Sequence, residues 1–183
     1  IACASATPAC SLARQIGRIL GTELRAVNGD LNFAPVLDVD TNPKNPVIAD
    51  RSLGKDPAVV TRLGLAIAQG LQESGVAACG NHFHGHGDTI QDSHYHLPRV
   101  DQPIERLRAV ELAPLAAAAK SGIATIMTAH VIYESLDSKY PGTLSRAILH
   151  DLLREQLGFG GAIVSDDIEM KAIANHFGLE EEI

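Results

Sequence analysis

Apolar residues in this chain follow two alternating patterns. In the first, four short runs are apolar at nearly every position until their last residues turn polar. Runs that are apolar on both faces are typical of strands in a parallel sheet covered by helices. We therefore predict four buried strands, over "LNFAPVLDV" (31–39), "VAACGNHF" (76–83), "ATIMTAHVI" (124–132) and "GAIVSDD" (161–167).

In the second pattern, apolar residues recur at spacings of three and four, which indicates helices. Asp56 is a candidate N-cap with Pro57 at the first helical position, and Ser145 is a second candidate cap. Pro114 should kink or split the helix that contains it. The predicted helices cover 11–27, 56–74, 102–122 and 145–160, so strands and helices alternate as βα units.

The polar residues at the ends of the predicted strands indicate where a site would lie. They are Asp38, the pair His82 and His84, then His130 and Asp166. The carboxyl ends of parallel strands share one face, which is the active-site face of a (β/α)8 barrel. A doubly wound sheet would also bind ligands there, but the chain lacks its glycine-rich fingerprint and a phosphate-binding loop.

The chain is too short to form a complete barrel. A complete (β/α)8 barrel needs about 250 residues, whereas this chain has 183 residues and four clear βα units. The predicted fold class is therefore α/β, of (β/α)8 TIM-barrel type with part of the barrel present. We expect a fragment from the middle of a longer enzyme; the alternative is a half-barrel that pairs with a second copy.

Charge and composition exclude several partners. The net charge is −7 and no basic cluster occurs, which argues against binding to nucleic acid or to an anionic membrane surface. The apolar runs are too short and too rich in alanine and glycine for a transmembrane helix. Cys3, Cys10 and Cys79 lack metal-type spacing, so we expect buried thiols in a reducing compartment.

A segment rich in histidine, "GNHFHGHGDTIQDSHYHLP" (80–98), carries the most distinctive chemistry. Five of the eight histidines lie in it, together with Asp88 and Asp92. The residue types alone allow a metal site, an acid/base site or a polar loop.

The ordered motifs "NFAPVLDVD", "ADRSLGKDP", "HFHGHGDTIQDSHYHLP", "IMTAHVIY" and "IVSDDIEMKAI" resemble glycoside hydrolase family 3, in its bacterial β-N-acetylglucosaminidase branch. The resemblance runs from about Leu12 to the end. It implies that residues 1–183 are part of the N-terminal catalytic barrel domain of that family. It further implies a cytoplasmic enzyme that removes terminal β-linked N-acetylglucosamine from peptidoglycan fragments without a cofactor.

The resemblance also assigns catalytic residues. His94 of "DSH" would be the general acid/base and Asp92 would orient it, while Asp166 of "SDD" would be the nucleophile. Imidazole suits the first role because it titrates near neutral pH. The pair departs from the two-carboxylate arrangement that is usual in glycosidases. Asp167 should point elsewhere and cap the next helix.

The substrate-binding residues of the family are matched only in part by this chain. Arg51 and His82 match sugar-binding residues of the family, and His130 lies where the family lines the pocket wall. Asn81 and His84 stand where the family has lysine and proline, so the contribution of Asn81 to binding is open. We expect His86 and Asp88 to brace the loop.

Two other functions stay open at this stage. One is a metal-dependent hydrolase on the same fold, with ligands from His82, His84 and His86 together with His130 and Asp166. The other is a catalytically incomplete, sugar-binding remnant, because the family's "D-Q-E-G-G" segment would precede this chain. For the enzyme hypothesis we predict no bound metal.

Overall fold

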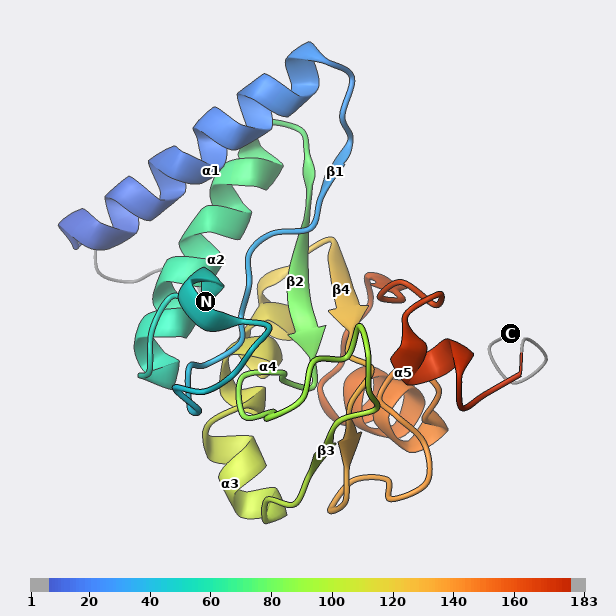
Figure 1. Cartoon of the computed structure of the whole chain (residues 1–183). Helices are drawn as coiled ribbons and strands as arrows, with labels where there is room; N and C mark the ends of the chain where they lie inside the picture. Colours follow the sequence, from blue (N-terminus) through green and yellow to red (C-terminus); the bar gives the residue numbers. More distant parts are fainter. Residues whose placement is uncertain (1–6, 179–183) are drawn as a thin grey trace.

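A four-stranded parallel sheet forms the centre of the molecule. The computed structural model describes residues 7–178. Within them, β1 (Leu31–Asn32), β2 (Ala77–Phe83), β4 (Thr125–Thr128) and β6 (Ala162–Val164) lie in the order β1-β2-β4-β6, and every neighbouring pair is parallel (Figure 1). Successive βα units therefore supply adjacent strands, as in a (β/α)8 barrel. This confirms the predicted fold class.

The first strand is shorter than predicted. Regular pairing ends at Asn32, although the chain continues beside β2, where Cys79 N donates to Ala34 O and Leu37 N donates to Asn81 O. Pro35 has no backbone N–H and so cannot donate to a strand ladder. The segment 33–37 therefore follows β2 through separate hydrogen bonds rather than as a continuous strand.

Helices α1 (Pro8–Ala26), α2 (Pro57–Glu73) and η2 (Ala147–Gln156) begin close to the predicted positions. Asp56 accepts a hydrogen bond from Ala58 N, and Ser145 Oγ accepts one from Ile148 N, so both predicted caps are confirmed. The hydrogen bonds of η2 are of the wider, π type.

The helix predicted over 102–122 is split, as Pro114 suggested. It forms α3 (Ile104–Ala109) and α4 (Leu112–Ser121), with the break at Val110 and Glu111. Pro114 cannot donate a hydrogen bond to the carbonyl four residues earlier, and it lies in the first turn of α4, where no such bond is needed. Gly122, with φ +81°, ends α4 in the left-handed region.

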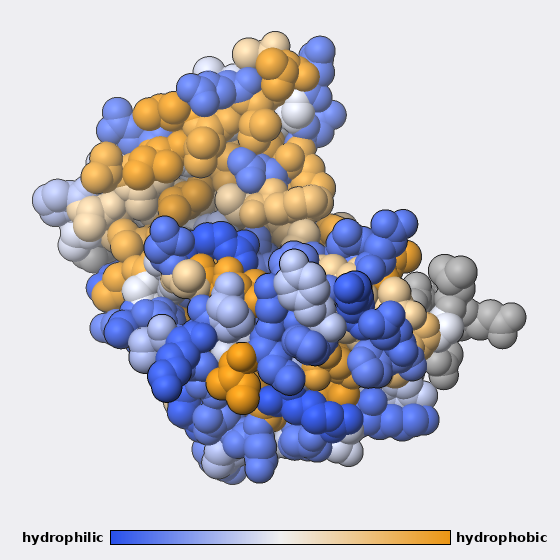
Figure 2. Space-filling view, viewed as in Figure 1, coloured by the Kyte–Doolittle hydropathy of each residue, from blue (hydrophilic) through white to orange (hydrophobic). Residues whose placement is uncertain are grey.

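Helices α2 and α4 pack against the sheet, and α1 packs on α2 (Figure 1). The face of α1 toward α2 consists of small residues, Cys10, Ala13, Gly17 and Gly21, and a Cβ on Gly17 would collide with Ile67 O. The larger apolar residues of α1 and the β1 region are left exposed. They are Leu12, Ile16, Ile19, Leu20, Val27, Leu31 and Phe33, and Figure 2 shows apolar side chains gathered over this part.

Two short strands that the sequence pattern did not predict form a second sheet. β3 (Arg99–Val100) pairs in parallel with β5 (Ile132–Tyr133). β3 closes the histidine-rich segment, which therefore forms a long loop between β2 and β3. A short helix, η1 (Ala49–Arg51), interrupts the connection from β1 to α2, and α5 (Lys171–Ala174) follows β6.

Two expectations from the sequence concern membrane-spanning helices and buried thiols. Among the described residues, no helix combines the length and apolar character that crossing a membrane requires. Cys10 and Cys79 are buried as predicted, and burial raises the pKa of the Cys79 thiol. Cys3 lies outside the described residues.

Candidate active site

Asp38, His82 and Asp166 lie together at the carboxyl edge of the sheet. Asp38 Oδ2 is 2.7 Å from His82 Nδ1, and His82 Nε2 is 4.0 Å from Asp166 Oδ2. Asp38 follows the β1 region, His82 lies in β2, and Asp166 lies just beyond β6. The prediction that the strand ends share one site is confirmed for these residues.

Asp38 is the buried centre of this cluster. Its side chain is fully buried, and it also accepts hydrogen bonds from His82 N at 3.1 Å and from His86 N at 2.5 Å. Burial alone would raise the pKa of Asp38, but the His82 ring and the His86 backbone outweigh it and hold the pKa below its ordinary value. A carboxylate that accepts from Nδ1–H leaves His82 Nε2 to face Asp166.

His130 is fully buried and supports the backbone beside Asp166. Its Nε2 donates to Asp167 O at 2.9 Å, and its Nδ1 is 2.7 Å from Thr143 Oγ1. Burial lowers the pKa of His130, which favours the neutral ring. Because both nitrogens are occupied, these contacts give no support to the predicted contact between His130 and the sugar.

Asp167 points away from the cluster, as expected, but its partner differs from the prediction. Its Oδ1 accepts from Glu169 N at 2.9 Å, so it caps a turn that precedes α5. The helix itself begins after Met170, which provides no side-chain cap. The prediction that Asp167 caps the next helix is therefore wrong, because Asp167 caps the turn just before that helix.

Asp92 and His94 form a pair on the loop between β2 and β3. Asp92 Oδ1 accepts from His94 N at 2.9 Å and lies 2.6 Å from His94 Nδ1. Partial burial would raise the pKa of Asp92, but the hydrogen bonds from His94 lower it overall. The His94 side chain is 59% exposed, so its Nε2 is available for proton transfer.

The remaining polar residues of the loop brace it, as predicted for His86 and Asp88. His86 contacts Thr89 and Ser93, while Asp88 accepts from Gln102 Nε2 at 2.8 Å. At Gly87 the loop passes so close to the backbone of Val39 that a Cβ would collide with its carbonyl. The loop thus has a rigid base and an exposed tip.

The three neighbouring histidines face different surroundings, which gives no support to a shared metal site. His82 pairs with Asp38, His86 with two hydroxyls, and His84 is buried beside the ring of Tyr133. Burial lowers the pKa of His84 to about 3. Across residues 7–178, no three side chains among histidine, cysteine, aspartate and glutamate are arranged to hold a metal ion.

Two predicted substrate-binding residues are engaged elsewhere. Asn81 Nδ2 donates to Phe33 O at 2.9 Å, and its side chain is almost fully buried. Arg51 is an exposed residue and donates to Val47 O within its own loop. Among the described residues, no hydrogen bond or ion pair joins either side chain to the cluster, so a role for Asn81 or Arg51 in binding stays a prediction.

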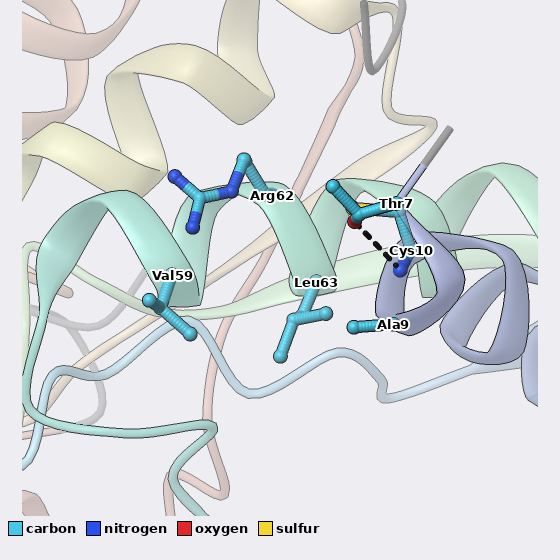
Figure 3. A pocket seen from close by; sticks show the side chains of 6 residues that line it. All are labelled: Thr7, Ala9, Cys10, Val59, Arg62 and Leu63. Carbon is cyan, nitrogen blue, oxygen red and sulfur yellow. Dashed lines mark hydrogen bonds between the residues drawn. The ribbon is translucent and has the colours of Figure 1, made fainter. Parts of the chain in front are cut away.

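Two hollows lie on the surface of the described residues. One of about 370 Å³ lies between the start of α1 and α2, where Figure 3 shows mostly apolar side chains. It contains Arg62 as its single charged side chain and lies on other elements than the cluster. The other, of about 440 Å³, lies on the outer side of the loop and is lined by Gln91, Tyr95, His96, Leu97, Arg99, Asn175 and His176. The chemistry therefore lies at the strand ends rather than in these hollows.

Comparisons with known proteins identify the family. The model of the glycosyl hydrolase family 3 N-terminal domain matches residues 1–183. A β-hexosaminidase from Neisseria meningitidis is 42% identical over 96% of this chain and 48% of its own length. The chain thus spans about half the length of the curated relatives that it matches.

Solved structures with related names are also similar to this chain. A family 3 β-N-acetylglucosaminidase from Paenibacillus is 45% identical with a TM-score of 0.92, over 94% of this chain and 33% of that one. NagZ from Neisseria gonorrhoeae, in complex with N-trifluoroacetyl-D-glucosamine, is 42% identical with a TM-score of 0.83, over 88% and 47% of the two chains. The same NagZ in complex with zinc ion is 40% identical with a TM-score of 0.84, over 94% and 48%.

Proposed function

We propose that this chain, which belongs to glycosyl hydrolase family 3, forms part of a retaining exo-β-N-acetylglucosaminidase. The observation that carries the proposal is the position of Asp166, just beyond β6 and 4.0 Å from a histidine that a buried carboxylate holds in place. The relatives named β-hexosaminidase and β-N-acetylglucosaminidase support the choice of sugar.

In the first step, an Asp166 oxygen attacks the anomeric carbon of the bound sugar. The bond from that carbon to the glycosidic oxygen breaks, and His94 Nε2 donates a proton to the departing oxygen. The product is a glycosyl ester on Asp166. Asp92 holds the His94 ring through Nδ1, so that the proton is exchanged at Nε2 alone.

In the second step, His94 takes a proton from a water molecule, whose oxygen attacks the same carbon. The ester bond breaks and Asp166 leaves as a carboxylate, so the product keeps the configuration of the substrate. Through both steps, His82 faces the Asp166 carboxylate from a ring that Asp38 orients.

The natural substrate that we propose is a muropeptide with a terminal β-linked N-acetylglucosamine, cleaved in the cytoplasm during cell-wall recycling. The supporting observation is the resemblance to NagZ, which binds N-trifluoroacetyl-D-glucosamine. Arg51, Asn81 and His82 are proposed sugar contacts. His82 is the best supported of them because it already faces Asp166.

Two substitutions in the complete protein test the assigned roles. Replacing Asp166 with Ala removes the group that forms the covalent bond, so hydrolysis should be lost for every leaving group. Replacing His94 with Ala removes the proton donor, which matters most for a sugar aglycone that leaves as an alkoxide. The loss of kcat/KM, which reports formation of the glycosyl ester, should therefore be larger for an N-acetylglucosamine disaccharide than for a nitrophenyl N-acetylglucosaminide by on the order of 10²–10⁴-fold.

Azide provides the control for the His94→Ala variant. Because the ester should accumulate on Asp166, azide is expected to restore turnover of the aryl substrate and to give a β-glycosyl azide. Equal losses on both substrates without rescue would show that His94 is not the acid/base. A wild-type protein that binds the sugar without hydrolysing either substrate would instead favour the sugar-binding remnant.

A further inference from the structure

Ser93 stands between the two proposed members of the acid/base pair and differs from both in exposure. It is 1% exposed, whereas the side chains of Asp92 and His94 are 27% and 59% exposed. A buried serine between two more exposed residues fixes the loop at that point, because its hydroxyl needs a hydrogen-bond partner inside the protein.

That partner is His86. Its Nε2 lies 2.9 Å from Ser93 Oγ, and its Nδ1 lies 2.8 Å from Thr89 Oγ1. Asn45 Nδ2 in turn donates to Thr89 Oγ1 and to the carbonyls of His86 and Thr89. The Nδ1 side of the imidazole is thus held by Thr89, which Asn45 holds in turn. These contacts fix the position of the ring and therefore of Nε2, which faces Ser93.

The backbone beside Ser93 is tied to the segment that follows Asp166. Ala172 N donates to Ser93 O, and Lys171 N donates to His94 O, both at 3.3 Å. These are long hydrogen bonds, so the short contact with His86 is the better-defined constraint at this point of the loop. Ser93 therefore joins the base of the loop to the segment that follows Asp166.

We propose that His86 is a positioning residue for the reaction: through the Ser93 hydroxyl it sets where Asp92 and His94 stand relative to Asp166. This inference rests on the proposed function, since it needs His94 to be the proton donor. Burial lowers the pKa of His86 to about 4, so the ring is neutral at pH 7 and can donate through one nitrogen while accepting through the other.

Two substitutions of similar chemistry separate positioning from folding. In His86→Gln the side-chain amide can reach the position of Nε2 and keep the contact with Ser93. In His86→Asn the amide reaches only the position of Nδ1, so the contact with Thr89 is kept and that with Ser93 is lost. Ser93→Ala removes the same contact from the other side and leaves the imidazole in place.

We expect His86→Asn and Ser93→Ala to lower kcat/KM, which reports formation of the glycosyl ester, by up to about 100-fold on an N-acetylglucosamine disaccharide, the effect of a small misplacement of a catalytic group. The loss of kcat/KM on a nitrophenyl N-acetylglucosaminide should be much smaller, because its leaving group needs no proton. KM for the disaccharide should change little. His86→Gln should retain most of the activity, and the double variant His86→Asn/Ser93→Ala should be no worse than either single variant.

Hydrogen exchange supplies a readout that does not depend on activity. The amides of Tyr95 and His96, which donate to Asp92 O, should exchange faster in Ser93→Ala and His86→Asn than in wild type or His86→Gln. Equal activity losses on both substrates, additive effects in the double variant, or unchanged exchange would overturn the inference. Failure of the proposed function looks different, since Asp166→Ala would then leave hydrolysis by the otherwise unaltered protein intact.

Discussion

Replacing Asp38 with Asn tests whether the buried carboxylate organises the site. The side chain keeps its shape but loses its charge, and one of its two acceptor oxygens becomes an NH₂ donor. In the native site both oxygens accept: Oδ1 from His86 N, and Oδ2 from the backbone and ring of His82. Whichever way the amide turns, its NH₂ group must face a backbone N–H.

The expected loss of stability follows from these three contacts. Hydrogen bonds to a charged group contribute about 1.5–3 kcal/mol, and a buried donor left without an acceptor costs a similar amount. We therefore expect Asp38→Asn to lower the free energy of unfolding by about 3 kcal/mol at pH 7. Activity should fall by on the order of 10²-fold, because His82 would no longer be held with Nε2 toward Asp166.

Urea unfolding followed by circular dichroism measures the first effect, and Asp40→Asn is the matched control. Asp40 is partly exposed, and its contact with Lys55 is long at 3.8 Å, so its loss should cost at most about 1 kcal/mol.

The pKa of Asp38 is lowered in the folded state. Its contribution is therefore fully present above the ordinary carboxyl value of 3.8 and is lost as the pH falls below it. Equal effects of the two variants at pH 7 would refute the central role of Asp38.

Two further predictions concern His84 and metal ions. Burial lowers the pKa of His84 from 6.5 to about 3, so the folded ring stays neutral while the unfolded chain takes up a proton below pH 6.5. Wild type should then lose about 3 kcal/mol of stability between pH 7 and pH 4 that His84→Leu does not lose; parallel pH profiles in urea unfolding would contradict this. A chelator should leave hexosaminidase activity of the complete protein unchanged, and loss of activity that zinc restores would favour the metal-dependent alternative.

The sequence determined the fold class and the side of the sheet on which the site lies. Apolar runs of strand length that alternate with helices are typical of a covered parallel sheet, and the polar residues at their ends then share one edge. Asp38, His82 and Asp166 could be grouped on this basis. The caps at Asp56 and Ser145 were equally local, because a cap depends on residues only two or three positions away.

The tertiary structure decided what each polar side chain contacts. The spacing His-x-His-x-His allows a common ligand, but the backbone sends His82, His84 and His86 to three different surroundings. The partners of His86 and of His130 come from outside the strands, and no periodicity predicts them. The sequence also did not determine which face of α1 packs against α2. The face with Gly17 and its small neighbours packs there, because it allows a closer approach, and the bulky apolar residues of α1 stay exposed. Backbone approach and side-chain direction depend on residues far apart along the chain, so only the folded structure determines them.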